Sequence, residues 1–158
     1  MDSRKMILTA LLIALVAVTT MVVNIPLPGV KGYVNIGDTV VLLAGLVFGP
    51  VVGAAAGALG SSLADVLLGY AYWAPWTFVI KGLEGLLAGW LVLRFRKATT
   101  LVTVLAAGVM VLGYFLVGII YYGVGPAVTS LPGDVLQGGV SVVLSLVLLH
   151  PIRKYLSL

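Results

Sequence analysis

Long apolar runs, separated by short polar or turn-rich segments, occupy most of this 158-residue chain. The first run, residues 6–23, is long enough to cross the hydrocarbon core of a bilayer as one α-helix. Only 9% of the residues are charged, whereas a soluble domain has about 25%. The chain is therefore predicted to be an integral membrane protein with almost no part outside the lipid.

Turn signals divide the apolar sequence into six runs. Gly49-Pro50 separates the second run from the third, because proline disfavours a helix at the residue before it. Residues 24–38 and residues 123–133 are rich in glycine and proline and are predicted to be external loops. We expect one domain, residues 1–158, with an all-α fold of six transmembrane helices in a compact bundle. The predicted spans are residues 6–23, 40–52 (from about Gly37), 51–68, 75–93, 101–122 and 134–149.

A secretory signal peptide is the competing interpretation of the first run, since basic residues precede an apolar region. No clean small-x-small cleavage site follows the run, and the next segments lead into further apolar runs. We therefore favour a membrane span.

The basic residues predict the orientation of the bundle. Six spans place both termini and the loop between spans four and five on one side. Lys31 falls in the first external loop, and Lys81 falls within span four. The other seven of the nine basic residues lie on the side of the termini, which the positive-inside rule makes cytoplasmic: Arg4, Lys5, Arg94, Arg96, Lys97, Arg153 and Lys154.

Two opposite charges, Lys81 and Glu84, lie inside the fourth span. Residues three apart share one face of a helix, so these two can pair with each other or with a ligand. A charge at bilayer depth is disfavoured by about 2.5–3.5 kcal/mol, so such residues usually face the bundle interior and mark a site. An ion pair that only fixes helix packing is the alternative.

Further polar residues gather at the external ends of the spans. Asn35 and Asp38 precede span two, Asp65 lies late in span three, and Asp134 and Gln137 open span six. A proton path needs polar groups through the full membrane thickness, whereas a pocket open to the outside needs them in the outer half only. The distribution favours such a pocket.

Structural roles are the alternative for the three aspartates. Asp38 and Asp134 stand where each could be the N-cap of its helix. Asp65 lies near a helix C-terminus, where a negative charge is unfavourable. It is therefore expected to have a partner such as Lys81.

Aromatic residues concentrate at the same level, and Trp73 or Tyr70 could stack on a flat ring. An ordinary interfacial aromatic belt is the simpler interpretation for most of them. The candidate substrate-binding residues are Asn35, Asp38, Tyr70, Trp73, Lys81, Glu84 and Gln137.

Small residues recur every four positions at Gly45, Gly49, Gly53 and Gly57. Such ladders let helix backbones approach closely in lipid. Packing within this chain is favoured over contact with another protein.

The sequence disfavours several other classes of function. It has no cysteine, and its single histidine, His150, adjoins Pro151 at the end of the last run, so no metal or cofactor site is expected. The Ser61-Ser62 pair has no nearby histidine to activate it, which argues against an enzyme. Basic residues at helix ends are typical of membrane topology rather than of nucleic-acid binding.

The run YVNIGDTVVLLAGLVFGPVVGAAAGALGSSLADVLLGY, followed by APWTFVIKGLEG, resembles the substrate-binding S components of energy-coupling factor (ECF) vitamin importers. The resemblance extends from Ala10 to the sixth span. It implies a cell-membrane protein that holds a vitamin near the external surface, with the first loop and helices four to six. It also implies a transmembrane T subunit and two ATPases as partners, in agreement with the lack of a GxxxxGK[ST] phosphate-binding loop here.

The family's Ala-x-x-x-Ala pattern on helix one, which contacts the T subunit, matches Ala10 and Ala14. Packing within the bundle is the usual explanation for two such alanines.

Within this family, the motifs are most similar to the branch for hydroxymethylpyrimidine or pyridoxine-like precursors, with riboflavin carriers as relatives. We therefore expect a binding subunit for a small heteroaromatic vitamin or precursor. One alternative is a riboflavin-specific S component. Another is a self-sufficient proton-coupled carrier, working as a homo-oligomer through Asp65, Lys81 and Glu84. A membrane enzyme or a purely structural protein is the least favoured.

Overall fold

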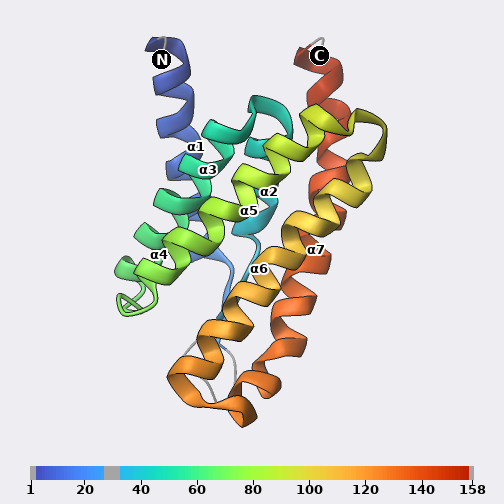
Figure 1. The fold of residues 1–158 in the computed structure, drawn as a ribbon. Helices are drawn as coiled ribbons and strands as arrows, with labels where there is room; N and C mark the ends of the chain where they lie inside the picture. The colour runs from blue at the N-terminus through green and yellow to red at the C-terminus, as the bar shows by residue number, and fades with distance from the viewer. Residues whose placement is uncertain (1–2, 27–32, 157–158) are drawn as a thin grey trace.

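The computed structural model describes residues 3–26 and 33–156 (Figure 1). Lys31, predicted in the first external loop, lies outside these residues. The elements in chain order are α1 (Ser3–Val22), β1 (Asn24–Pro26), β2 (Tyr33–Asn35), α2 (Gly37–Phe48), α3 (Pro50–Ala55), η1 (Ala56–Ser61), α4 (Ser62–Leu67), α5 (Ala74–Arg94), η2 (Arg96–Ala98), α6 (Thr99–Tyr122) and α7 (Val124–Leu156).

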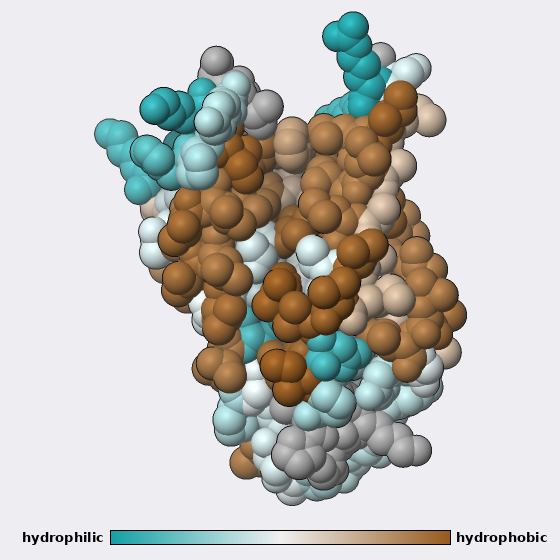
Figure 2. All heavy atoms as spheres, turned by 180° about the vertical axis from the view of Figure 1, so that it is seen from behind, coloured by the Kyte–Doolittle hydropathy of each residue, from teal (hydrophilic) through white to brown (hydrophobic). Residues whose placement is uncertain are grey.

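The described residues form a helical membrane bundle. Five helical segments are long and apolar enough to cross a bilayer, and the helix Gly37–Phe48 is shorter. The third pass joins α3, the π-helix η1 and α4 without a break. Large apolar side chains point outward, as at Leu11, which is 64% exposed, and Figure 2 shows them as an apolar belt around the middle of one face. The predicted all-α integral membrane fold is confirmed.

Both ends of the chain lie at one end of the bundle, together with the connection between α5 and α6 (Figure 1). The seven basic residues assigned to the side of the termini belong to these segments, and Figure 2 shows hydrophilic atoms at this end. This arrangement agrees with an even number of membrane crossings. That this end faces the cytoplasm stays a prediction.

The turn between α2 and α3 is the one that Gly49-Pro50 predicts. Gly49 has a φ of 92°, which favours glycine, and its N–H donates to the carbonyl of Gly45. Pro50 opens α3, where a missing N–H costs nothing because the first turn of a helix leaves it unpaired. Gly49 therefore serves the turn rather than helix packing.

The predicted loop at residues 123–133 is wrong, because α7 begins at Val124 and continues through this segment. Pro126 lies in the first turn, where helices tolerate proline, and Pro132 lies inside the helix. An internal proline removes one backbone hydrogen bond, which the extensive packing of α7 against α6 offsets here. Asp134 is consequently inside a helix, and its interpretation as an N-cap is also wrong.

A short antiparallel hairpin joins α1 to α2, and the sequence did not predict it. Its strands pair Asn24 with Asn35 and Pro26 with Tyr33. Three-residue strands are too short to show an alternating pattern. The hairpin matters because it carries Tyr33 and Asn35 to the centre of the bundle.

Glycines let α5 approach α2 and the third pass at backbone distance. A Cβ on Gly85 would lie 2.1 Å from the carbonyl oxygen of Gly53, and one on Gly45 would lie 2.6 Å from the carbonyl oxygen of Gly85. A Cβ on Gly57 would lie 2.2 Å from the carbonyl oxygen of Lys81. The predicted packing within the chain is confirmed for these three glycines of the ladder, and it brings the charged face of α5 against α2.

Candidate binding site

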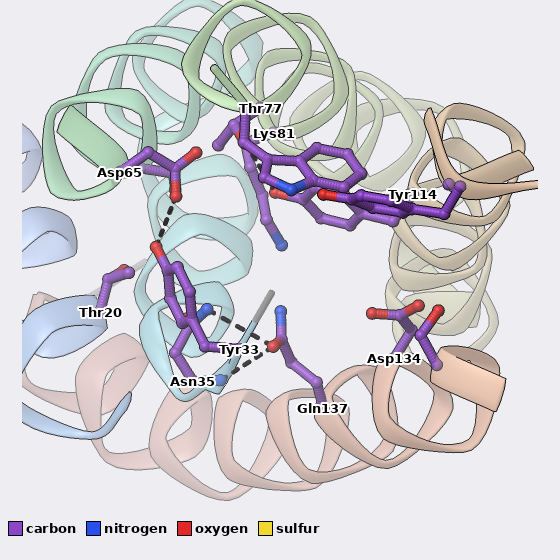
Figure 3. Close-up of a pocket in the computed structure, with 14 residues that line it drawn as sticks. Thr20, Tyr33, Asn35, Asp65, Thr77, Lys81, Tyr114, Asp134 and Gln137 are labelled. Carbon is purple, nitrogen blue, oxygen red and sulfur yellow. Dashed lines mark hydrogen bonds between the residues drawn. The ribbon is translucent and has the colours of Figure 1, made fainter. Parts of the chain in front are cut away.

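A cavity opens at the end of the bundle opposite the termini, with about 660 Å³ of empty space including its mouth. Side chains from β2, α4, α5, α6 and α7 converge on it (Figure 3). The polar lining includes Asn35, Asp65, Thr77, Lys81, Asp134 and Gln137, and the aromatic lining consists of Tyr33, Trp73, Tyr114 and Tyr122.

A buried cluster of charges lies at one side of the cavity. The Lys81 ammonium pairs with the carboxylate of Asp38 on α2, and it also lies 3.2 Å from Oε2 of Glu84. All three side chains are almost completely buried. The predicted pair of Lys81 and Glu84 is confirmed, and Asp38 is its third member.

The side chain of Asp38 does not cap α2. Ile36 precedes the helix, and Asp38 lies in its first turn with its carboxylate directed to Lys81. The N-cap interpretation is therefore wrong, although a negative charge in the first turn still suits the helix dipole.

Gln137 links α7 to the cluster and to the hairpin. Its Nε2 donates to Oδ2 of Asp38 at 2.8 Å, and its Oε1 accepts from the backbone N–H of Asn35 at 2.8 Å. The side-chain Oδ1 of Asn35 in turn accepts from the N–H of Gly37, at 2.8 Å, where α2 begins. Both ends of the Gln137 amide are thus satisfied, and three segments distant in sequence are held in one network.

Asp65 is paired with the hairpin. The hydroxyl of Tyr33 donates to Oδ1 of Asp65 at 2.6 Å. Burial, together with the negative charge of Asp65, raises the pKa of the Tyr33 phenol, so the phenol stays protonated and can donate. The expected partner, Lys81, is wrong as an ion-pair or hydrogen-bond partner, since its ammonium makes those contacts with Asp38 and Glu84.

Aromatic rings form the part of the wall beside Lys81 (Figure 3). Trp73 packs edge-on against Tyr114, with ring centroids 5.7 Å apart, and the Tyr114 hydroxyl donates to Thr77 at 3.2 Å. The Lys81 ammonium lies 5.3 Å from the centroid of the Tyr114 ring, within the range of a cation–π contact. The cavity therefore offers a flat apolar surface beside hydrogen-bonding groups.

A family model described as the ECF-type riboflavin transporter, S component, matches residues 1–154. The chain belongs to this family. It is thus a substrate-binding subunit of a vitamin transporter, a multi-pass protein of the cell membrane and not an enzyme.

Two similar proteins can be aligned with most of the sequence of this S component. The thiamine precursor transporter HmpT of Lactococcus lactis is 32% identical over 146 residues, which are 92% of this chain and 85% of HmpT. An uncharacterised protein of Pyrococcus woesei is 49% identical over 128 residues, 77% of this chain and 83% of that protein.

Four of the predicted site residues of this S component line the cavity, namely Asn35, Trp73, Lys81 and Gln137. The other three support lining residues. Asp38 and Glu84 hold Lys81, and Tyr70 packs on Tyr33 with ring centroids 5.0 Å apart.

Sequence reasoning missed Thr77 and Tyr114 as cavity residues of this S component. Thr77 lies one turn before Lys81 on the same face of α5, so the spacing alone could have identified it. Tyr114 lies in the middle of the apolar α6, where a polar-tipped ring stands out from its neighbours. Asp65 and Asp134 were placed at the level of the predicted pocket but were not among the candidate substrate-binding residues.

The proposed partner-binding residues lie elsewhere on this S component. Ala10 and Ala14 are both exposed on α1, beside the exposed Leu11. Their side chains are therefore not used in packing within the described bundle.

Proposed function

We propose that this S component captures a small heteroaromatic vitamin precursor, of the hydroxymethylpyrimidine or pyridoxine type, from outside the cell. The observation that carries the proposal is the cavity wall itself, which brings the rings of Trp73 and Tyr114 to the same cavity as Lys81, Asn35 and Gln137. Such a wall suits a flat ring with polar substituents. The similarity to a thiamine precursor transporter supports the same ligand class.

Each group has a role in this proposal. The aromatic rings cover the face of the ligand ring, while Lys81 donates to an acceptor on its edge. Asn35 and Gln137 orient the hydroxymethyl group through the hairpin network. Asp38, Glu84 and Tyr70 hold these residues in place and do not touch the ligand.

Riboflavin is the second candidate ligand. The description of the matching family model favours it, and the isoalloxazine ring would use the same aromatic wall. The two candidates differ in size and in the charge of the ring, which makes them separable by direct binding.

Uptake in this proposal depends on an ECF module with a T subunit and two ATPases. The exposed Ala10 and Ala14 on α1 form the contact with the T subunit. The basic end of the bundle faces the cytoplasm, where the positive-inside rule puts it. The cavity then opens to the outside.

A self-sufficient proton-coupled carrier is disfavoured by the position of the acidic groups. The acidic side chains among the described residues, Asp38, Asp65, Glu84 and Asp134, all lie at or beside the cavity. A proton relay needs such groups through the thickness of the membrane.

Thermal-shift and equilibrium-binding measurements on the purified chain test the proposal. We expect hydroxymethylpyrimidine or pyridoxine to raise the melting temperature and to bind more tightly than riboflavin. Stabilisation by riboflavin alone would establish the second candidate instead. Proton-driven uptake by the chain alone in liposomes would refute both.

A further inference from the structure

Two carboxylates, Asp65 and Asp134, line the cavity outside the ion-paired cluster of Asp38, Lys81 and Glu84. Asp65 is only 3% exposed, and its Oδ2 has no hydrogen-bond partner within residues 3–26 and 33–156. Asp134 is 9% exposed and makes no hydrogen bond or ion pair with any other described residue. Figure 3 shows them on different sides of the cavity, with the carboxylate of Asp134 pointing into it. Each therefore has acceptor capacity that is free for a ligand.

Lys81 does not neutralise these two groups, because Asp38 and Glu84 already hold its ammonium. It is also the only basic residue among the described lining of the cavity. Four of the five acidic residues of the chain thus lie around one cation. Because a buried carboxylate is costly unless it is paired, a ligand that donates hydrogen bonds to Asp65 and Asp134, or that carries a positive charge, would stabilise them.

We infer that Asp65 and Asp134 select a ligand whose ring is positively charged or bears amino N–H donors, and that they disfavour a neutral flavin. This inference rests on the proposed function, since it gives the chemical class of the ligand in the same cavity. The faces of Trp73 and Tyr114 contribute to the same selection, because aromatic faces attract cations. A basic aminopyrimidine or pyridine has this chemistry, whereas riboflavin is uncharged at neutral pH.

A pair of probes that differ in one group tests the inference on the purified full chain. The first probe is the hydroxymethylpyrimidine that bears an exocyclic amino group. The second is its oxo analogue, in which a carbonyl replaces the amino group and the basicity is lost. Equilibrium binding of both is measured on the wild-type protein and on D65N and D134N. The control is S141A, which alters a fully buried hydroxyl that does not line the cavity.

We expect the wild-type protein to bind the amino probe about tenfold or more tightly than the oxo probe, as loss of a charge-assisted hydrogen bond implies. D65N and D134N should each reduce this preference, whereas S141A should keep it. The comparison of the two probes on the wild-type protein needs no variant, so it tests the inference even where an aspartate variant fails to fold.

Equal affinity for the two probes, or a preference for the oxo probe or riboflavin, overturns the inference and leaves vitamin binding intact. An unchanged preference in folded D65N and D134N also overturns it. If no pyrimidine, pyridine or flavin binds at all, the proposed function fails together with the inference.

Discussion

The Lys81 ammonium on α5 pairs with the Asp38 carboxylate on α2, 43 residues earlier in the chain, inside a cluster that also contains Glu84. The pair joins two helices that approach each other over glycines, so neither side chain can easily withdraw to solvent. Charge balance and helix packing therefore depend on each other at this point.

Replacing Lys81 with methionine should destabilise the protein strongly. K81M leaves Asp38 and Glu84 buried without their cation, and breaking a buried ion pair from one side costs about 3–5 kcal/mol. Chemical denaturation in mixed micelles measures the free energy of unfolding. The triple variant K81M/D38N/E84Q, which removes all three charges, should recover part of the loss. An unchanged stability of K81M would contradict the role of the cluster.

Gly85→Ala should loosen the contact between α5 and the third pass. The new Cβ would lie 2.1 Å from the carbonyl oxygen of Gly53, and backbone cannot yield as a flexible side chain does. Gly108→Ala is the matched control, because a Cβ there meets nothing within 4 Å. We expect a clearly lower melting temperature for the first variant and an unchanged or slightly higher one for the second.

Gln137→Ala should release the hairpin from the bundle. The variant leaves the N–H of Asn35 and Oδ2 of Asp38 without their shared partner, at a cost of about 1–3 kcal/mol for each unsatisfied group. Hydrogen exchange at the Asn35 amide should accelerate. Ser145→Ala, on the same helix, removes only a local bond to the carbonyl of Val142 and should not affect that amide. If the Asn35 amide exchanges at the same rate in both variants, Gln137 does not hold the hairpin.

Tyr33→Phe should weaken the connection between the hairpin and α4. It removes the 2.6 Å hydrogen bond to Asp65 but keeps the ring that packs on Tyr70. A hydrogen bond to a charged acceptor contributes about 1.5–3 kcal/mol, so the melting temperature should fall. Tyr155→Phe, at a residue that is 88% exposed, serves as the control and should change nothing. An equal fall in the melting temperature of Tyr155→Phe would show that the effect of Tyr33→Phe does not come from the lost hydrogen bond to Asp65.

Bulky substitutions on α1 should separate assembly from ligand binding. Ala10→Trp and Ala14→Trp project from an exposed helix face, so binding by the isolated chain should be unaffected, while copurification with the T subunit should be lost. Val143→Trp, on the exposed face of α7, is the control and should still copurify. Normal assembly of both alanine variants would place the contact elsewhere on the surface.

Much of the helical fold could be predicted because hydropathy and proline chemistry act locally. The turn at Gly49-Pro50 needs only those two residues. The segment around Pro132 could not be predicted in the same way, since its helix depends on packing against α6. The hairpin was not predicted because its pairing, Ile25 with Val34 at its centre, depends on the tertiary structure and leaves no pattern in the sequence.

The candidate site, too, could be predicted from the sequence only in part. Lys81 and Glu84 were identifiable because charges in an apolar helix are costly wherever they lie. The partner of Asp65 was not identifiable, because it is Tyr33 from the unpredicted hairpin. Thr77 and Tyr114 carry signals in the sequence, namely the spacing of Thr77 from Lys81 and the polar tip of Tyr114 in an apolar helix, but only the structure shows that both converge on one cavity.

The shortness of α2 affects how much of the bilayer this helix can span. Its 12 residues rise about 18 Å, well short of the roughly 30 Å of hydrocarbon in a bilayer. A helix this short leaves part of the hydrocarbon thickness to other backbone, and non-helical backbone at that depth must have its amides paired. The bond from the Asn35 amide to Gln137 provides such a pairing for the extended segment that precedes α2.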